Sequence, residues 1–144
     1  MINVVVVGLG HIANRHIDAI ESTVGLTLYG VCDVNDKALN ALETDAKKFV
    51  LFQDVLDDDS VDVVALTTPS WLHHSMILDS LSLDKIVLCE KPLALTSSHV
   101  NEIIQYSLDS TIPVWVVLQQ RYAPAVQYLQ SLLTPEGIGT PYLV

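Results

Sequence analysis

The chain has 144 residues, the length of one ordinary domain, and half of them are apolar, which is enough to build a core. Its formal net charge is −10, so it repels nucleic acid and anionic membranes, and both are excluded as main partners. Cys32 and Cys89 each follow an apolar run and are expected to be buried, reduced thiols. The first apolar run is too short for a signal peptide or a membrane span, so we expect a soluble, cytoplasmic protein.

Apolar runs alternate with segments of helical spacing along the chain. Unbroken runs rich in β-branched residues are typical of parallel strands that are buried on both faces. The predicted strands are residues 2–7, 26–32, 50–52, 61–66, 86–89 and 114–118. The predicted helical segments are residues 11–21, 38–46 with Asn35 as N-cap, a single turn at 54–58, 72–81, a helix capped by Ser97 that runs to Leu108, and 125–133.

Strands that alternate with helical crossovers predict an α/β fold of the Rossmann type. The expected sheet is doubly wound, mainly parallel and six-stranded, with helices on both faces. We assign residues 1–134 to this domain. Residues 135–144 look like a turn that enters a new strand, so we expect them to begin a second domain that this chain truncates.

A Gly-rich turn joins the first strand to the first helix. Gly8 can adopt the backbone angles of a sharp turn, and Gly10 has no Cβ that would keep a pyrophosphate away from the backbone. Ala13 is small enough for close packing of helix and strand. Free N–H groups around His11 and Ile12, with the positive end of the helix dipole, predict a phosphate site.

An acidic residue follows the turn at the spacing that a dinucleotide requires. Asp33 lies twenty residues after Ala13, at the end of the second predicted strand. Its carboxylate can accept hydrogen bonds from the adenosine ribose and would repel a 2′-phosphate, which favours NAD over NADP. The glycines alone would also suit a tight turn without a nucleotide. The strand, the helix and the acid together favour the cofactor site.

In such a sheet the ligand lies across the carboxyl ends of the strands, where this chain places polar or special residues. A surface role remains open for each of them, and adjacent His73 and His74 point in different directions and do not form a metal pair. We predict no metal site. The further candidates for contact with the cofactor are Thr67, Thr68, Pro69, Trp71, His73, Glu90, Lys91, Gln119 and Arg121.

Lys91 is the candidate catalytic residue. It follows the fifth predicted strand, and Pro92 disfavours helical backbone angles at Lys91. A lysine held there could orient a substrate hydroxyl and stabilise the charge that develops as its proton leaves. Glu90 could hold Lys91 or order the loop. A surface ion pair between the two residues is the open alternative.

These residues together resemble the N-terminal NAD(P)-binding half of the glucose–fructose oxidoreductase and inositol dehydrogenase family (Gfo/Idh/MocA). The string Glu90-Lys91-Pro92 is the most specific match, and Asp84 stands where the family often has Gly, at a turn whose strain Asp tolerates. The other matching segments are residues 8–13 with His16, Asp33, 68–73, 87–94, 120–124 and 137–141, which occur in the family's order.

The resemblance implies an oxidoreductase that transfers hydride between NAD and a hydroxyl or keto group of a sugar, nucleotide sugar or polyol. It implies that Lys91 contacts substrate and nicotinamide, and that 68–69 and His73 lie by the cofactor. A second domain would supply most of the substrate pocket, a catalytic histidine and the contacts of a homo-oligomer. Residues 119–122 look like those of members that act on nucleotide-linked amino-sugar acids.

Two other functions remain open at this stage. The chain could be a non-catalytic sensor or binding module that uses NAD as a ligand, although Lys91 argues against this because a sensor does not need it. It could also be a truncated, partly folded product whose apolar surface is normally covered. The substrate, the direction of reaction and the oligomer do not follow from this sequence.

Overall fold

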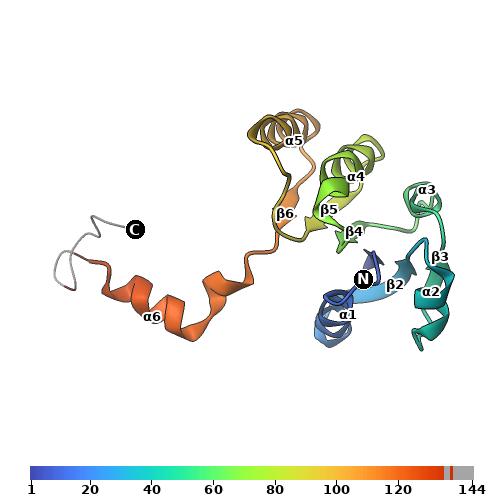
Figure 1. Ribbon diagram of the computed structural model, residues 1–144, viewed down its shortest axis with the longest axis horizontal. Coiled ribbons are helices and arrows are strands. Elements are labelled where there is room, and N and C mark those ends of the chain that lie inside the picture. The colour runs from blue at the N-terminus through green and yellow to red at the C-terminus, as the bar shows by residue number, and fades with distance from the viewer. Residues whose placement is uncertain (135–136, 138–144) are drawn as a thin grey trace.

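The computed structural model describes residues 1–134 and residue 137. Within them the sheet has six strands in the order β3-β2-β1-β4-β5-β6, and every neighbouring pair is parallel (Figure 1). This confirms the doubly wound Rossmann-type fold. The strands are β1 (Ile2–Val7), β2 (Leu26–Cys32), β3 (Lys47–Phe49), β4 (Val63–Leu66), β5 (Ile86–Cys89) and β6 (Val114–Val116).

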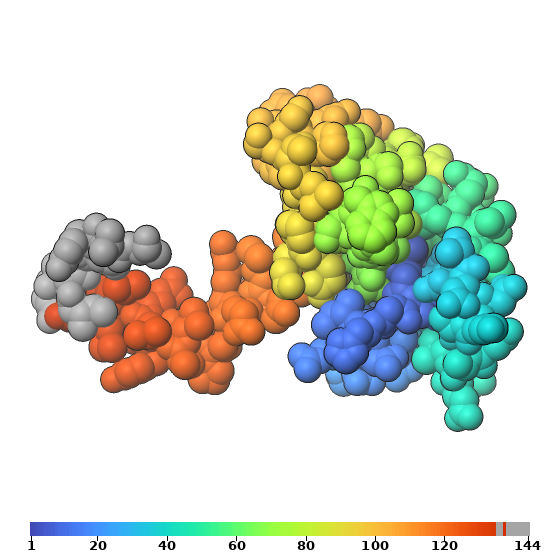
Figure 2. Space-filling model, in the orientation of Figure 1, coloured from blue at the N-terminus to red at the C-terminus, as the bar shows by residue number. Residues whose placement is uncertain are grey.

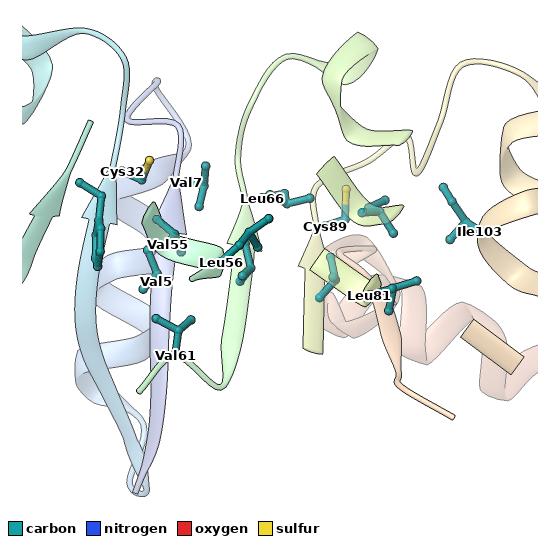
Figure 3. Packing of buried hydrophobic residues seen from close by; sticks show 14 residues of the cluster. Val5, Val7, Cys32, Val55, Leu56, Val61, Leu66, Leu81, Cys89 and Ile103 are labelled. Atoms are coloured by element: carbon teal, nitrogen blue, oxygen red, sulfur yellow. The ribbon is translucent and has the colours of Figure 1, made fainter. Parts of the chain in front are cut away.

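Helices cover both faces of the sheet and bury two separate apolar clusters. α3, α4 and α5 pack on one face, where Val5, Leu66 and Ile103 belong to one cluster (Figure 3). α1 and α2 pack on the other face around Val6 and Ile17. The helices are α1 (Ala13–Ser22), α2 (Asp36–Ala41), α3 (Phe52–Leu56), α4 (Ser70–Ser82), α5 (Ser97–Ser110), the 3-10 turn η1 (Gln119–Tyr122) and α6 (Pro124–Leu132).

α6 departs from the doubly wound pattern because it does not return to the sheet. It extends away from the rest of the molecule after β6 (Figures 1 and 2), and none of its described residues is buried. The face of β6 that α1 borders therefore lacks a helix within the described residues, and Trp115 is 52% exposed. A groove of about 750 Å³ lies there, between α1 and β6.

Several predicted elements differ from the structure in their bounds, the third strand and the second helix most, and Thr96 instead of Ser97 caps α5. The third strand was expected at 50–52 but lies at Lys47–Phe49, and Phe52 begins α3. β3 is an edge strand, which tolerates lysine: the ammonium of Lys47 lies over the Phe49 ring, 4.7 Å from its centre, and donates to the Asp58 carboxylate at 2.7 Å. α2 ends at Ala41 instead of reaching residue 46, although Asn35 caps it as predicted.

Two predictions about single residues are confirmed. Asp84 has φ +58°, so it does occupy the left-handed turn before β5 that favours glycine. Cys32 and Cys89 are buried free thiols, and burial raises the pKa of each to about 12. Both thiols are therefore protonated and unreactive at neutral pH.

We predict that Ile103→Ala destabilises the domain far more than the same substitution at the neighbouring residue, Ile104. Ile103 is 1% exposed and is the buried anchor of α5, so its truncation should lower the free energy of unfolding by about 2–5 kcal/mol. Ile104 is 44% exposed, and Ile104→Ala should cost about 0.5 kcal/mol. Urea unfolding followed by circular dichroism measures both, and equal losses would contradict this packing of α5.

Candidate functional site

The carboxyl ends of five neighbouring strands meet at one edge of the sheet, because all the strands are parallel. The predicted site residues therefore come from five separate segments that lie on this edge. The β1–α1 turn and the end of β2 occupy one part, and the ends of β4, β5 and β6 continue the edge in the order of the sheet. This is the position at which doubly wound sheets bind their ligands.

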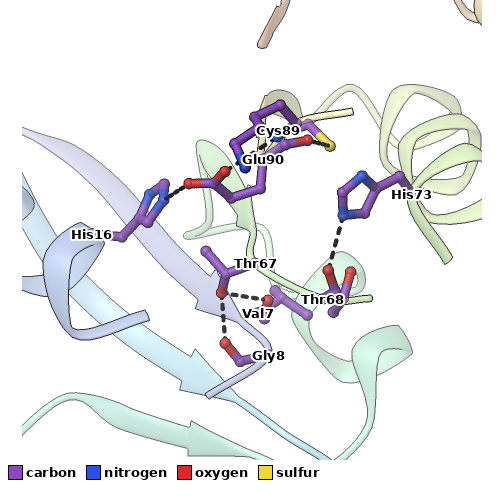
Figure 4. A network of polar contacts seen from close by, with 9 residues as sticks. Val7, Gly8, His16, Thr67, Thr68, His73, Cys89 and Glu90 are labelled. Atoms are coloured by element: carbon purple, nitrogen blue, oxygen red, sulfur yellow. Dashed lines mark hydrogen bonds and ion pairs between the residues drawn. The ribbon is translucent and has the colours of Figure 1, made fainter. Parts of the chain in front are cut away.

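Gly8 forms the turn between β1 and α1 through a contact that a side chain would prevent. Its φ is +92°, and a Cβ there would lie 3.0 Å from backbone atoms of Thr67 and Thr68. The buried Thr67 hydroxyl donates to the carbonyl oxygens of Val7 and Gly8, at 3.0 and 2.5 Å (Figure 4). Thr67 was predicted to bind cofactor, and its observed contacts brace the turn.

Gly10 has a different environment from Gly8. A Cβ on Gly10 would meet no atom of the described residues within 4 Å, so the space above its backbone is open. His11 beside it is exposed, Ile12 is half-buried at the N-cap of α1, and Ala13 is buried against the sheet. The first turn of α1 contains no acidic residue. The helix start is thus open to an anion, as the phosphate prediction requires.

Asp33 lies beside the Gly-rich turn and is bonded to it. One carboxylate oxygen accepts a hydrogen bond from the backbone N–H of Leu9 at 2.6 Å, and the other accepts one from Asn35 at 2.8 Å. Asp33 remains partly exposed. Its carboxylate therefore fixes the turn on which the pyrophosphate is expected while it still faces solvent, where a ribose can reach it.

The β4–α4 segment contributes one buried and one exposed aromatic side chain. His73 is 1% exposed, and its Nδ1 lies 2.7 Å from the Pro92 carbonyl oxygen, while its Nε2 lies 2.9 Å from that of Thr68. A neutral imidazole has one N–H, so it donates to one of these carbonyls at a time. Trp71 is 72% exposed at the start of α4, whose N-cap position is occupied by Pro69 without a side-chain hydrogen bond. Contact of these residues with a cofactor stays a prediction.

His74 points away from His73, as predicted for adjacent helical residues. Its Nε2 lies 2.9 Å from a carboxylate oxygen of Glu102, and its ring stacks on His99 with 3.9 Å between centroids. Among the residues that the structure describes, no group of three or more His, Cys, Asp or Glu side chains could hold a metal ion.

Lys91 is exposed in the loop after β5, and its side chain makes no ion pair or hydrogen bond within the described residues. In the described part of the chain, no carboxylate lies within 4 Å of its ammonium, so the surface ion pair with Glu90 does not form. Glu90 orders the loop instead. One of its carboxylate oxygens accepts the backbone N–H of Lys91 at 3.2 Å, and the other lies 2.9 Å from Nε2 of His16 (Figure 4).

His16 is a residue that the sequence reasoning named only as part of the family resemblance and gave no role in the site. It lies on α1, one turn after the Gly-rich segment, and it reaches across to Glu90, 74 residues later. The occurrence of His16 close to the matched segment 8–13 was one indication that it belongs to the site. Its contact with Glu90 could not be inferred from the spacing of the residues.

The last segment of this strand edge is η1, which follows β6. Residues of η1 also line the groove between α1 and β6. Gln119 and Tyr122 line the groove together with His16 and Glu90. Arg121 is exposed on the same turn, and its predicted contact with the cofactor stays a prediction. The polar side chains of the strand ends thus border a largely apolar hollow.

Comparison with known proteins matches most of the chain to one family model. Residues 2–116 match the Gfo/Idh/MocA model, described as an oxidoreductase family with an NAD-binding Rossmann fold. Inositol 2-dehydrogenase of Salmonella paratyphi B is 28% identical over 96% of this chain, which spans 43% of that relative. The chain thus spans less than half the length of this curated relative.

Solved structures repeat the fold. The WlbA dehydrogenase of Chromobacterium violaceum, in complex with NADH and UDP-GlcNAcA, is 32% identical with a TM-score of 0.86, and the match covers 90% of this chain and 39% of that one. Scyllo-inositol dehydrogenase of Lactobacillus casei, with NAD(H) and scyllo-inositol, is 22% identical with a TM-score of 0.83, over 92% and 40% of the two chains. The latter likeness shows the fold alone.

No helix in the described residues has the length and hydropathy needed to cross a membrane.

We predict that replacing Gly8 by alanine lowers stability, whereas replacing Gly10 by alanine weakens NADH binding. Gly8→Ala should lower the free energy of unfolding by about 1–3 kcal/mol, because Ala is strained at this φ and meets the Thr67 backbone. Gly10→Ala should change stability by about 0.5 kcal/mol or less but weaken NADH binding by about tenfold or more, because its Cβ enters the open cradle. Thermal melts and NADH titrations separate the two effects. Full NADH affinity in Gly10→Ala would place the phosphates elsewhere.

Proposed function

Because this chain belongs to the Gfo/Idh/MocA oxidoreductase family, we propose that it is the NAD-binding domain of a dehydrogenase that acts on a sugar, nucleotide sugar or polyol. The observation that carries the proposal is the placement of Lys91. Its side chain, which pairs with no carboxylate of the described residues, lies at the strand edge that also holds the Gly-rich turn and Asp33. Residues 135–136 and 138–144, where we expect a second domain to begin, lie outside the described residues.

The residues present fit a dinucleotide. The open backbone at Gly10 and the start of α1 would hold the pyrophosphate, and Asp33 would accept the hydroxyls of the adenosine ribose. When bound, NAD supplies the group that accepts or donates a hydride. A negative carboxylate at Asp33 disfavours a 2′-phosphate, which is why we propose NAD as the preferred cofactor over NADP.

Lys91 would act on the substrate hydroxyl. Its ammonium is free to donate a hydrogen bond to that oxygen and to stabilise the negative charge that grows there as the proton leaves. Oxidation of the CH–OH group needs this proton to move away from oxygen. The catalytic acid or base that completes the transfer would lie in the second domain, together with most of the substrate pocket and the contacts of a homo-oligomer.

The substrate class rests on the relatives. Inositol 2-dehydrogenases and the WlbA dehydrogenase complex with UDP-GlcNAcA represent the two chemical classes, a cyclic polyol and a nucleotide-linked sugar acid. The 32% identity with the WlbA enzyme and the resemblance of residues 119–122 favour testing the nucleotide-linked sugar acid first. Turnover of neither class by the full-length protein, with NADH binding intact, would support the alternative of a non-catalytic NAD-binding sensor.

We predict that Asp33 sets the preference between cofactors. The chain should bind NADH at least about tenfold more tightly than NADPH, and Asp33→Ala should reduce this ratio. The ratio is the informative quantity, because the loss of the bond to Leu9 will also weaken the binding of both nucleotides. Calorimetric titration of this chain measures it, with exposed Asp36→Asn as the control. An unchanged ratio in Asp33→Ala would exclude this role.

We predict that Lys91 serves turnover more than cofactor binding. In the full-length protein, Lys91→Ala should reduce kcat by about 10²–10⁴-fold, because the developing charge on oxygen loses its donor. In this chain, Lys91→Ala should change NADH affinity by about threefold or less. Lys91→Arg is the control that keeps the charge. Equal losses of turnover and NADH affinity would contradict the proposed role.

A further inference from the structure

The segment that carries Lys91 is held from both faces of the sheet. α1 packs on one face and α4 on the other, and each sends one histidine to the residues that flank Lys91. His73 on α4 contacts the carbonyl of Pro92, and His16 on α1 contacts the carboxylate of Glu90. Lys91 therefore lies between two anchored neighbours, although its own side chain is free.

The contact between His16 and Glu90 is short and shielded. Nε2 of His16 lies 2.9 Å from Oε1 of Glu90, and each side chain is 10% exposed. The acceptor is a carboxylate oxygen, so the ring must carry its proton on Nε2 to donate. A hydrogen bond to an ionised group with little water around it is among the stronger ones in proteins.

The carboxylate of Glu90 passes this constraint on to the backbone of Lys91. Its second oxygen, Oε2, accepts the N–H of Lys91 at 3.2 Å. The distance is long for a charge-assisted bond, so it depends on the carboxylate being kept in place. His16 is the side chain that keeps it there, since it occupies the other oxygen.

We propose that His16 is a positioning residue for Lys91, acting through the Glu90 carboxylate. The importance of this for catalysis rests on the proposed function of Lys91. His16 lies on the helix whose start is expected to hold the cofactor phosphates, so the same helix fixes both the cofactor cradle and the loop of Lys91. The fixed distance between the two is what hydride and proton transfer at one carbon centre require.

The backbone amide of Lys91 tests the proposal without any catalysis. In this chain, His16→Leu should speed hydrogen exchange of the Lys91 amide by about tenfold, because Glu90 is no longer held. His16→Gln keeps an N–H donor and should restore exchange to within about threefold of the unmodified chain. His74→Leu is the matched control, since His74 contacts Glu102 instead. NMR of labelled protein reads the amide, and an unchanged rate in His16→Leu overturns the proposal.

Turnover of the full-length protein shows whether this positioning serves Lys91. His16→Leu should reduce kcat, and His16→Gln should recover most of it. In a Lys91→Ala background, His16→Leu should cause little further loss, because an effect that acts through Lys91 disappears with it. Additive losses would overturn the proposal. If Lys91→Ala alone leaves kcat intact, the proposed function of Lys91 fails, while the amide measurement still decides whether His16 positions the segment.

Discussion

The close contact between the Gly8 turn and the end of β4 is the constraint on which the site depends. Gly8 donates its N–H to the Cys32 carbonyl at 2.7 Å, and Thr67 donates both its N–H and its hydroxyl to the carbonyl of Val7. The ends of β1, β2 and β4 are thereby fixed against one another. A Cβ on Gly8 would push them apart, so the turn and the strand ends require glycine there.

A second fixed point lies at Glu90, which would be costly to bury alone. A buried carboxylate needs partners, and Glu90 has them in His16 and the N–H of Lys91. One partner lies on α1 and the other on the loop of Glu90 itself, so the pairing of one buried acid ties α1 to the end of β5. The result is a rigid frame around a lysine that remains exposed. Under the proposed role of Lys91, such a frame would keep the lysine in one position while leaving its ammonium available to a ligand.

Sequence reasoning located the sheet, and it named candidate residues that the fold does bring to one edge, because the signals for both are local. The unbroken valines of β1 and the spacing from Gly8 to Asp33 each depend on one segment. It placed β3 wrongly, because the apolar run at 50–52 looked more like a strand than the neighbouring segment that contains two lysines. An edge strand tolerates such lysines, and β3 lies at Lys47–Phe49. It also missed His16, because a contact between residues 74 positions apart is set by the packing of α1 on the sheet and leaves no periodic trace.

The same edge of the sheet therefore contains two kinds of surface. The part at the Gly-rich turn is built to receive a charged, extended ligand on backbone N–H groups, with Asp33 at its border. The part between α1 and β6 is an apolar groove with His16, Glu90 and Gln119 at its margin. Lys91 follows Glu90, which lines the groove, and its loop lies on the strand edge that also carries the Gly-rich turn. A hydroxylated substrate carbon brought to this loop would face both the cofactor cradle and the lysine. Under the proposed function, this arrangement would place the lysine at the border of an apolar groove that the described residues leave open.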